Sequence, residues 1–436
     1  MKKVIKILIV CLIVSLVVLL VVGVVVTMST HSRVNALRQE IKASGDPLYL
    51  VDFEAEADEE ENNAYFHLMN AREDINAFDE FLSDDLSGLS GINLSDTSNI
   101  AKSDLDALEK YVQEQKDLFA QIERMADCQK YQADIDFSKG ISVLLPHVPL
   151  LRSVKNFLQA KTIVDVSQQK GDEAIRNCIE GLRISRLQME EPLLVSFLVA
   201  LQMEGAMLDS AFYVLSSTPT SVEVRADLKR EVEASKRGRC AAQALKGERA
   251  CGIQTFKDLR EGDDEAFQGM GAPNLILDFA FKKTYLNDDE SKFIEVMNIA
   301  IKLLDKPYAE RVRFFDEVVT EVQNSEFRFA VTKLIQPAWF AVGEVVDIHN
   351  AKARCLQVIL QLQAEGDVAL DKLPEDPFSG KPLLALPSEQ GWTVYSVGKN
   401  QQDDQGDIGT QGQPIRLTPD VGYGPFPVAS SDEDAS

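Results

Sequence analysis

The sequence predicts a mainly α-helical protein that begins with a transmembrane helix and ends with a small β-hairpin module. Residues 7–26 form a run of 20 residues in which only Ser15 and Gly23 are not strongly apolar. Residues 62–365 place apolar side chains at spacings of three and four, which is the spacing of one helix face. Residues 366–409 are instead interrupted by Pro and Gly and contain two short strand-like stretches. We therefore expect an irregular multi-helix body between an anchor and a β module.

The apolar run has the length of a membrane span. At about 1.5 Å per residue it covers roughly 30 Å, the thickness of the hydrocarbon layer. A cleaved signal peptide would have a shorter apolar run, of about 7–15 residues, and a small-residue cleavage site, which the following TMSTHSR does not offer. A buried amphipathic helix would have a polar face. We therefore assign residues 1–30 as an uncleaved anchor and expect one membrane span.

The charged residues indicate the orientation of the chain in the membrane and argue against nucleic acid as a partner. Three lysines and no acid precede the run, and Arg33, Arg38 and Lys42 follow it. A short basic N-terminus favours the cytoplasmic side of a bacterial inner membrane, so the bulk of the chain is expected to be extracytoplasmic. The net charge is -24, from 69 acidic and 45 basic residues. Nucleic acid is therefore not expected as a partner, because binding phosphates requires clustered Lys and Arg.

Between the anchor and the β module the chain divides into two parts. Residues 31–61 are expected to be a stalk and linker that Gly45 and Pro47 interrupt, and residues 62–365 a helical domain. Capping boxes are predicted at Ser103 with Asp106 and at Thr220 with Glu223. The helix that starts at Pro192 is apolar on most sides, so it is expected to be central. The expected helices cover 64–81, 103–126, 150–170, 172–189, 192–217, 220–260, 274–286, 289–305, 307–323 and 326–365, with an interruption near Pro337.

The cysteines do not indicate a disulfide framework. Five of them follow the anchor, and no C-x-x-C occurs. Cys240 and Cys251 are predicted to share one helix face about 16 Å apart, which is too far for a disulfide. Mostly buried free thiols are therefore expected at Cys128, Cys178, Cys240, Cys251 and Cys355.

No residue pattern indicates a catalytic site. The four histidines form no H-E-x-x-H, and the chain has no G-x-S-x-G, P-loop or G-x-G-x-x-G. His349 is interpreted as a packing histidine. We therefore assign no catalytic or cofactor-binding residue and expect a non-enzymatic envelope protein whose helical body contacts other proteins. The alternative is an extracytoplasmic, hydrolase-like enzyme whose site forms only in three dimensions.

The C-terminal module is expected to be folded. Pro374 and Pro377 favour extended backbone in the residues before them, and Phe378 provides an apolar plug that we expect to pack on the helix ending near Glu365. The stretches PLLAL and WTVYSV read as two strands joined around PSEQG. A loop with clustered acids follows, and Ca²⁺ takes six to eight oxygen ligands from such loops.

This order of residues resembles the C-terminal part of the major pseudopilin of type II secretion systems, over roughly residues 350–408. The second motif of that family, Y-S-x-G, is matched by Tyr395, Ser396 and Gly398. The first motif is matched, with Ser379 as an insertion, by Leu373, Pro374, Asp376, Pro377, Phe378 and Gly380. The resemblance implies one Ca²⁺ bound by Asp403, Asp404 and Asp407 with backbone carbonyls near Ser396 and Gly398. The alternative is a structural cap whose Asp residues are only solvated.

The N-terminal part departs from the pseudopilin pattern. The first acidic residue is Glu40, beyond the apolar run, so pilin-type processing and assembly are not expected. The whole layout resembles large bacterial envelope proteins that carry such a tail, a resemblance that assigns no activity. It leads us to expect association with type II secretion or envelope organisation. Residues 410–436, rich in Gly, Pro and acids, are expected to be disordered.

Overall fold

The computed structural model describes residues 14–15, 28–54, 60–84, 100–262, 279–325, 328–335, 337–409 and 419–427. Within these ranges the chain forms 13 labelled α-helices, an additional helix before them and one three-stranded antiparallel sheet, so the predicted mainly helical fold is confirmed. Of the predicted anchor, residues 1–30, only 14–15 and 28–30 lie within the described residues, and they are helical.

A further helix over residues 28–43 precedes the labelled elements. The α-helices are α2 (Ala64–Asn70), α3 (Arg72–Asp84), α4 (Lys102–Glu114), α5 (Lys116–Asp127), α6 (His147–Ser167), α7 (Gly171–Gln188), α8 (Leu194–Ser217), α9 (Val222–Glu233), α10 (Arg237–Glu261), α13 (Phe279–Leu303), α14 (Tyr308–Asn324), α15 (Ala330–Ile335) and α16 (Pro337–Glu365). Short 3-10 turns are η1 (Leu50–Phe53), η2 (Glu60–Asn62), η4 (Phe137–Ser142) and η5 (Gly366–Lys372).

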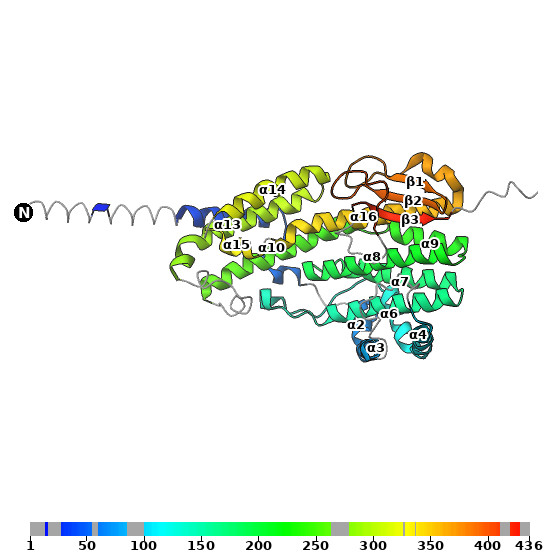
Figure 1. The fold of residues 1–436 in the computed structure, drawn as a ribbon. Helices are drawn as coiled ribbons and strands as arrows, with labels where there is room; N and C mark the ends of the chain where they lie inside the picture. Colours follow the sequence, from blue (N-terminus) through cyan, green and yellow to red (C-terminus); the bar gives the residue numbers. More distant parts are fainter. Residues whose placement is uncertain are drawn as a thin grey trace, which may run out of the picture.

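The helix α8 runs through the middle of the body (Figure 1) and contributes to both of its large apolar cores. Its Met207 packs with residues of α2 to α9 in the first core, and its Phe197 packs with residues of α10, α13 and α15 in the second. The predicted central position of this helix is therefore confirmed. Among the described residues, α8 is also the one helix long and apolar enough to cross a membrane, but 72% of its apolar window is buried inside the fold.

Two predicted helix starts are wrong in detail. The capping box at Ser103 does not form, because α4 begins one residue earlier, after Ala101, without a side-chain cap. The cap of α9 is Ser221 rather than Thr220, and its hydroxyl accepts a hydrogen bond from the Val224 amide at 3.3 Å. A capping pattern in sequence does not fix which neighbouring residue adopts the extended backbone that a cap requires.

Three predicted helix boundaries are corrected as well. The expected helix 103–126 is two helices that meet at Gln115, and the expected helix 220–260 is interrupted between α9 and α10. In contrast, α13 continues through residues 287–289, where two helices were expected. Within this continuous stretch Asp289 is buried and accepts hydrogen bonds from the Val331 and Thr332 amides.

The C-terminal module is a three-stranded sheet with the order β1 (Leu384–Ser388), β2 (Gly391–Ser396) and β3 (Val421–Phe426). The expected β1–β2 hairpin is present, with Leu384 opposite Tyr395. The expectation of disorder beyond Gly409 is wrong for residues 419–427, because β3 pairs antiparallel with β2 and buries Tyr423 and Phe426. The other parts of the tail, 410–418 and 428–436, lie outside the described residues.

The sheet packs against α16, at the end of the body far from the helix 28–43 (Figure 1). Phe378 is buried among Ile348 and Ala351 of α16, with its ring 4.8 Å from that of Tyr308. The prediction that Phe378 packs on this helix is confirmed. In addition, the Tyr423 hydroxyl of β3 donates a 2.8 Å hydrogen bond to Asp209 of α8. The module is therefore continuous with the body rather than tethered to it.

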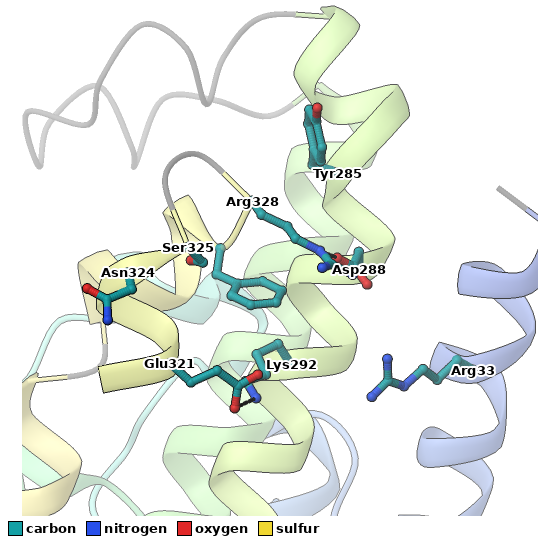
Figure 2. A pocket seen from close by; sticks show the side chains of 9 residues that line it. Arg33, Tyr285, Asp288, Lys292, Glu321, Asn324, Ser325 and Arg328 are labelled. Carbon is teal, nitrogen blue, oxygen red and sulfur yellow. Dashed lines mark hydrogen bonds and ion pairs between the residues drawn. The ribbon is translucent and has the colours of Figure 1, made fainter. Parts of the chain in front are cut away.

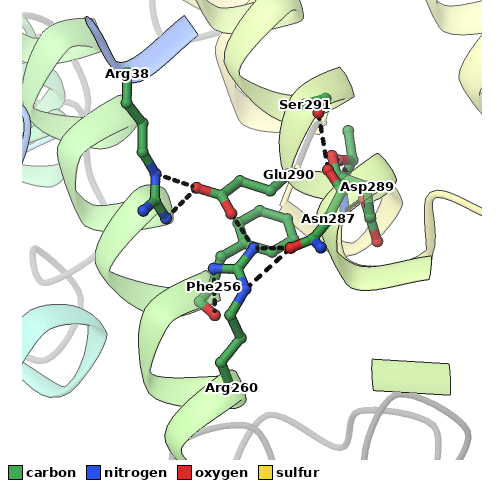
Figure 3. Close-up of polar contacts among 8 residues, drawn as sticks. Arg38, Phe256, Arg260, Asn287, Asp289, Glu290 and Ser291 are labelled. Carbon is green, nitrogen blue, oxygen red and sulfur yellow. Dashed lines mark hydrogen bonds and ion pairs between the residues drawn. The ribbon is translucent and has the colours of Figure 1, made fainter. Parts of the chain in front are cut away.

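The segment expected to be a stalk and linker makes extensive contacts with the body. Ile41 of the helix 28–43 is buried in the second core, and Asp46 forms ion pairs with Lys246 at 2.7 Å and Arg249 at 2.9 Å. Figure 3 shows a second contact, in which Glu290 of α13 lies between Arg38 and Arg260. Residues 28–54 are thus fixed to the helices α10 and α13.

Candidate functional site

The acidic loop covers the outer side of β2. Asp403 accepts hydrogen bonds from the Tyr395 hydroxyl at 3.0 Å and the Gln405 amide at 2.8 Å. Asp404 accepts one from the Asn400 side chain at 2.7 Å. Asp407 is exposed and accepts one from the Gly409 amide at 3.3 Å. The three predicted calcium ligands therefore lie on one loop, each with a protein donor.

A fourth carboxylate under the same loop was missed in the sequence. Asp420 is fully buried and accepts hydrogen bonds from the Gly406 amide at 2.9 Å and the Asp404 amide at 3.5 Å. Burial, together with the charges of Asp404 and Asp403, raises its pKa to about 6. Asp420 lies within the stretch that was expected to be disordered, residues 410–436, and the pairing of β3 brings it under the loop.

The oxygen donors of this loop have the chemistry that Ca²⁺ prefers, but their arrangement does not fit a bound ion. No group of three or more His, Cys, Asp or Glu side chains in the described part of the chain converges as metal ligands. Asp403 and Asp404 are turned toward Tyr395 and Asn400 instead. As it lies, the loop is a cover for β2, and calcium at this loop stays a prediction from the resemblance.

The two motifs that carry the resemblance meet at one buried side chain. Asp376 of the first motif is 1% exposed and accepts a 2.5 Å hydrogen bond from the Ser396 hydroxyl of the second. It also accepts hydrogen bonds from the Ser379 hydroxyl at 2.7 Å and from the Phe378 amide at 3.0 Å. The motif residues thus hold the module together, and their role here is structural.

Next to the helix 28–43 the body has a charged pocket of about 610 Å³ (Figure 2). Its cationic side chains already have carboxylate partners: Arg33 pairs with Glu295, Lys292 with Glu321, and Arg328 with Asp288. Because these charges are neutralised within the protein, the pocket has no pronounced preference for an anionic ligand.

A larger cleft of about 1050 Å³ lies between α2, the segment 128–137 and the turn from α7 to α8. Its walls are mixed, with aromatic and aliphatic side chains such as Phe66, Met69 and Leu187 beside polar groups. A concave, partly apolar cavity with a few polar groups is the usual form of a ligand site. We therefore take this cleft as the candidate functional site.

The base of the cleft contains a buried polar group. Glu191 is 4% exposed and its Oε1 accepts hydrogen bonds from the Ser196 hydroxyl and from His147 Nε2, the latter at 3.2 Å. Its Oε2 has no hydrogen-bond partner among the described residues, and neither has the hydroxyl of Tyr131 beside it. Sequence reasoning missed both residues, because each falls between two expected helices: Glu191 between 172–189 and 192–217, and Tyr131 between 103–126 and 150–170.

These groups do not form a nucleophile with a base. Ser196 is fully buried, and its hydroxyl donates a hydrogen bond to the carboxylate rather than to a histidine. Cys128 lines the cleft, but burial and the neighbouring charge of Asp127 raise its pKa, which lowers the thiolate fraction. The cleft as described is therefore suited to binding rather than to covalent catalysis.

His349 packs in the interior of the body, and the cysteines of the body are free thiols. His349 is buried, and burial with the nearby charges of Arg237 and Lys352 lowers its pKa to about 3. It packs against Gly205, where an added Cβ would lie 2.5 Å from its ring, so the interpretation as a packing histidine is confirmed. The five cysteines of the body are free, as predicted, and Cys128 and Cys251 are only partly buried.

No protein-family model matches the chain, and the comparisons with curated proteins and with solved structures also give no match.

Proposed function

We propose that the chain is a single-pass envelope protein whose helical body is held in a fixed orientation at the membrane and binds a partner in the cleft. In this proposal the apolar run is the anchor, the body is extracytoplasmic at a bacterial inner membrane, and the protein acts by binding. Association with type II secretion or envelope organisation follows from the resemblance of the C-terminal module and is part of the proposal.

The observation that supports it is the contact of Glu290 with Arg38 and Arg260. Glu290 of α13 is fully buried and accepts hydrogen bonds from Arg38 at 2.5 and 2.8 Å, and from Arg260. Arg38 belongs to the helix 28–43, which begins two residues after the apolar run. The hydrogen bonds of a carboxylate with two guanidinium groups are strong and directional when they are shielded from water. Such a contact favours a body that cannot swing freely about its anchor.

A binding role is favoured over an enzymatic one by the chemistry of the cleft. Its buried carboxylate is an acceptor, its buried serine is inaccessible, and its cysteine has a raised pKa. The wide, partly apolar walls fit a side chain or a small organic ligand.

Fractionation tests the membrane part of the proposal. The full chain should stay in the membrane fraction after a carbonate wash, and a chain lacking residues 1–27 should be soluble. Protease added to spheroplasts should digest the body. Full-length protein in the soluble fraction would refute the anchor, and a protected body would reverse the orientation.

Cross-linking in intact membranes tests the role of the cleft. Replacing Ala133, a small residue of the cleft, with Arg should remove the cross-linked partner by filling the cavity. The matched control is Val222→Arg, since Val222 is 67% exposed and does not line the cleft. Retention of the partner by both variants would contradict a binding role for the cleft. Identification of secretion-system subunits in the cross-linked product would support the proposed association.

The calcium prediction has its own test. An ion that binds only the folded chain raises its melting temperature. If Asp403, Asp404 and Asp407 gather around Ca²⁺, millimolar calcium should raise the melting temperature, and the double variant Asp403→Ala, Asp404→Ala should abolish the rise. A melt that is insensitive to both calcium and chelator would leave the loop as a structural cap.

A further inference from the structure

We infer that the cleft binds a primary ammonium group on an apolar arm, with Glu191 and Tyr131 as its polar contacts. The inference rests on the proposed binding role of the cleft and specifies its ligand. Two buried polar atoms of residues that line the cleft carry it, the Oε2 atom of Glu191 and the hydroxyl oxygen of Tyr131. Neither has a hydrogen-bond partner among the described residues.

One oxygen of the Glu191 carboxylate accepts hydrogen bonds, and the other accepts none among the described residues. Its Oε1 accepts the hydrogen bonds from His147 and Ser196, which fix the side chain at the base of the cleft. A buried carboxylate oxygen without a donor is unfavourable, because it has lost its hydrogen bonds to water and accepts none from the protein. A ligand that brings N–H donors and a positive charge would satisfy Oε2, whereas an anion would be repelled.

The aromatic rings around this oxygen favour a cation as well. Tyr131 and Tyr65 meet edge to face with ring centroids 6.1 Å apart, and each lies 5.9 Å from the ring of His147. Burial and the neighbouring charge of Glu191 raise the pKa of Tyr131, so its hydroxyl stays protonated. A protonated phenol has lone pairs for an ammonium proton, and ring faces attract cations.

The apolar part of the cleft lining fits the apolar arm. Phe53, Phe66, Met69 and Leu187 line the cleft, whose volume of about 1050 Å³ exceeds the needs of a small amine. Two charged side chains of the lining, Arg186 and Glu190, are already paired with Glu231 and Arg239. An ammonium on an apolar arm occurs both in free amines and in the lysine side chains of polypeptides, and the cleft is large enough for either.

Isothermal titration of the full chain in detergent micelles tests the ligand chemistry. The probes are 2-phenylethylamine, its neutral isostere 2-phenylethanol, and a capped tripeptide with a central lysine beside the same peptide with norleucine. We expect the amine to bind at least about tenfold more tightly than the alcohol, a ratio that one charged contact can supply. Preference for the lysine peptide over the norleucine peptide would identify polypeptides as a source, and preference for the amine alone would identify free amines. Equal affinities within both pairs, or no binding, would overturn the inference.

Two tyrosine variants make the test specific. Tyr131→Phe removes one hydroxyl and should weaken amine binding about tenfold without lowering the melting temperature, because an unpaired buried hydroxyl is lost. Tyr111→Phe is the matched control, since its hydroxyl is also buried without a partner among the described residues but lies outside the cleft. Unchanged amine affinity in Tyr131→Phe would overturn the assignment.

Glu191→Gln keeps the shape and should abolish the preference for amine over alcohol, and a preserved preference would refute the role of the carboxylate. Failure of this inference can be told from failure of the proposed function. Amine binding by a chain that washes off the membrane refutes only the anchor, and an anchored chain that ignores amines refutes only the ligand.

Discussion

Asp376 accepts a 2.5 Å hydrogen bond from the Ser396 hydroxyl, which joins the Pro-rich entry of the C-terminal module to the end of its middle strand. The same carboxylate accepts a hydrogen bond from the Val397 amide at 3.3 Å. Because Asp376 is 1% exposed, each of these donors would be left buried and unpaired without it. One side chain therefore fixes the entry segment of the module to its middle strand.

Asp376→Ala should destabilise the protein by about 3 kcal/mol, since several buried donors lose a charged acceptor at once. Urea denaturation followed by circular dichroism measures the loss. Asp407→Ala removes an exposed carboxylate of the same module and should change the stability by less than about 0.5 kcal/mol. Similar stabilities of the two variants would show that Asp376 does not hold the module.

The C-terminal module shows which structural features could be predicted from the sequence and which could not. Local patterns predicted the β1–β2 hairpin and the packing of Phe378, because turn residues and strand alternation lie close together in the chain. The strand β3 was missed because Gly422, Gly424 and Pro425 made its sequence look disordered. It forms because β2 offers it a partner edge and α8 a hydrogen-bond acceptor at Asp209.

The buried charged contacts were also not predicted, because the two partners lie far apart in the sequence. Nothing near Glu290 in the chain indicates that it will be buried against Arg38, which lies 252 positions away. Likewise nothing near Glu191 in the chain indicates that His147 will contact it, since 44 positions separate them. Helical periodicity identifies which face of a helix is buried, but not which charged groups from other helices meet there.

Glu290→Gln should release the helix 28–43 from the body. It removes the charge between Arg38 and Arg260, and breaking a buried ion pair costs about 3–5 kcal/mol locally. Hydrogen exchange of the amides in residues 28–43 should increase strongly, while exchange in α8 changes little.

The control for this variant is Glu295→Gln, which removes the carboxylate paired with the half-exposed Arg33. An exposed pair contributes about 0–1 kcal/mol, so exchange should change little. If both variants leave the exchange of residues 28–43 unaffected, apolar packing of Ile41 rather than Glu290 holds this helix.

Two glycines of α10 should respond oppositely to alanine. At Gly247 an added Cβ would lie 1.7 Å from the carbonyl oxygen of Pro192, so Gly247→Ala has to displace backbone and should cost about 3 kcal/mol. At Gly238 nothing lies within 4 Å, and Gly238→Ala should stabilise by about 0.5 kcal/mol through helix propensity. Thermal unfolding of both variants measures the difference. A neutral Gly247→Ala would show that α10 does not approach the α7–α8 turn this closely.

The pH dependence of stability should report on Asp420. Burial raises its pKa in the folded protein to about 6, from about 3.8 when it is exposed. Between these values the folded chain holds a proton that the unfolded chain releases, so the free energy of unfolding should fall as pH rises from about 4 to about 6. The contribution is complete below pH 4 and lost above pH 6.

Asp420→Asn keeps an oxygen for the Gly406 amide and should flatten this part of the profile. Asp407→Asn should keep the slope, because that carboxylate is exposed. The midpoints of urea unfolding at half-unit pH steps provide the measurement. The slopes of the variants are compared with that of the unmodified protein, because Asp289 and Glu180, whose pKa values burial raises to about 7 and about 8, contribute their own slope over the same range. An unchanged slope in Asp420→Asn would mean that this carboxylate does not titrate in the buried position that β3 gives it.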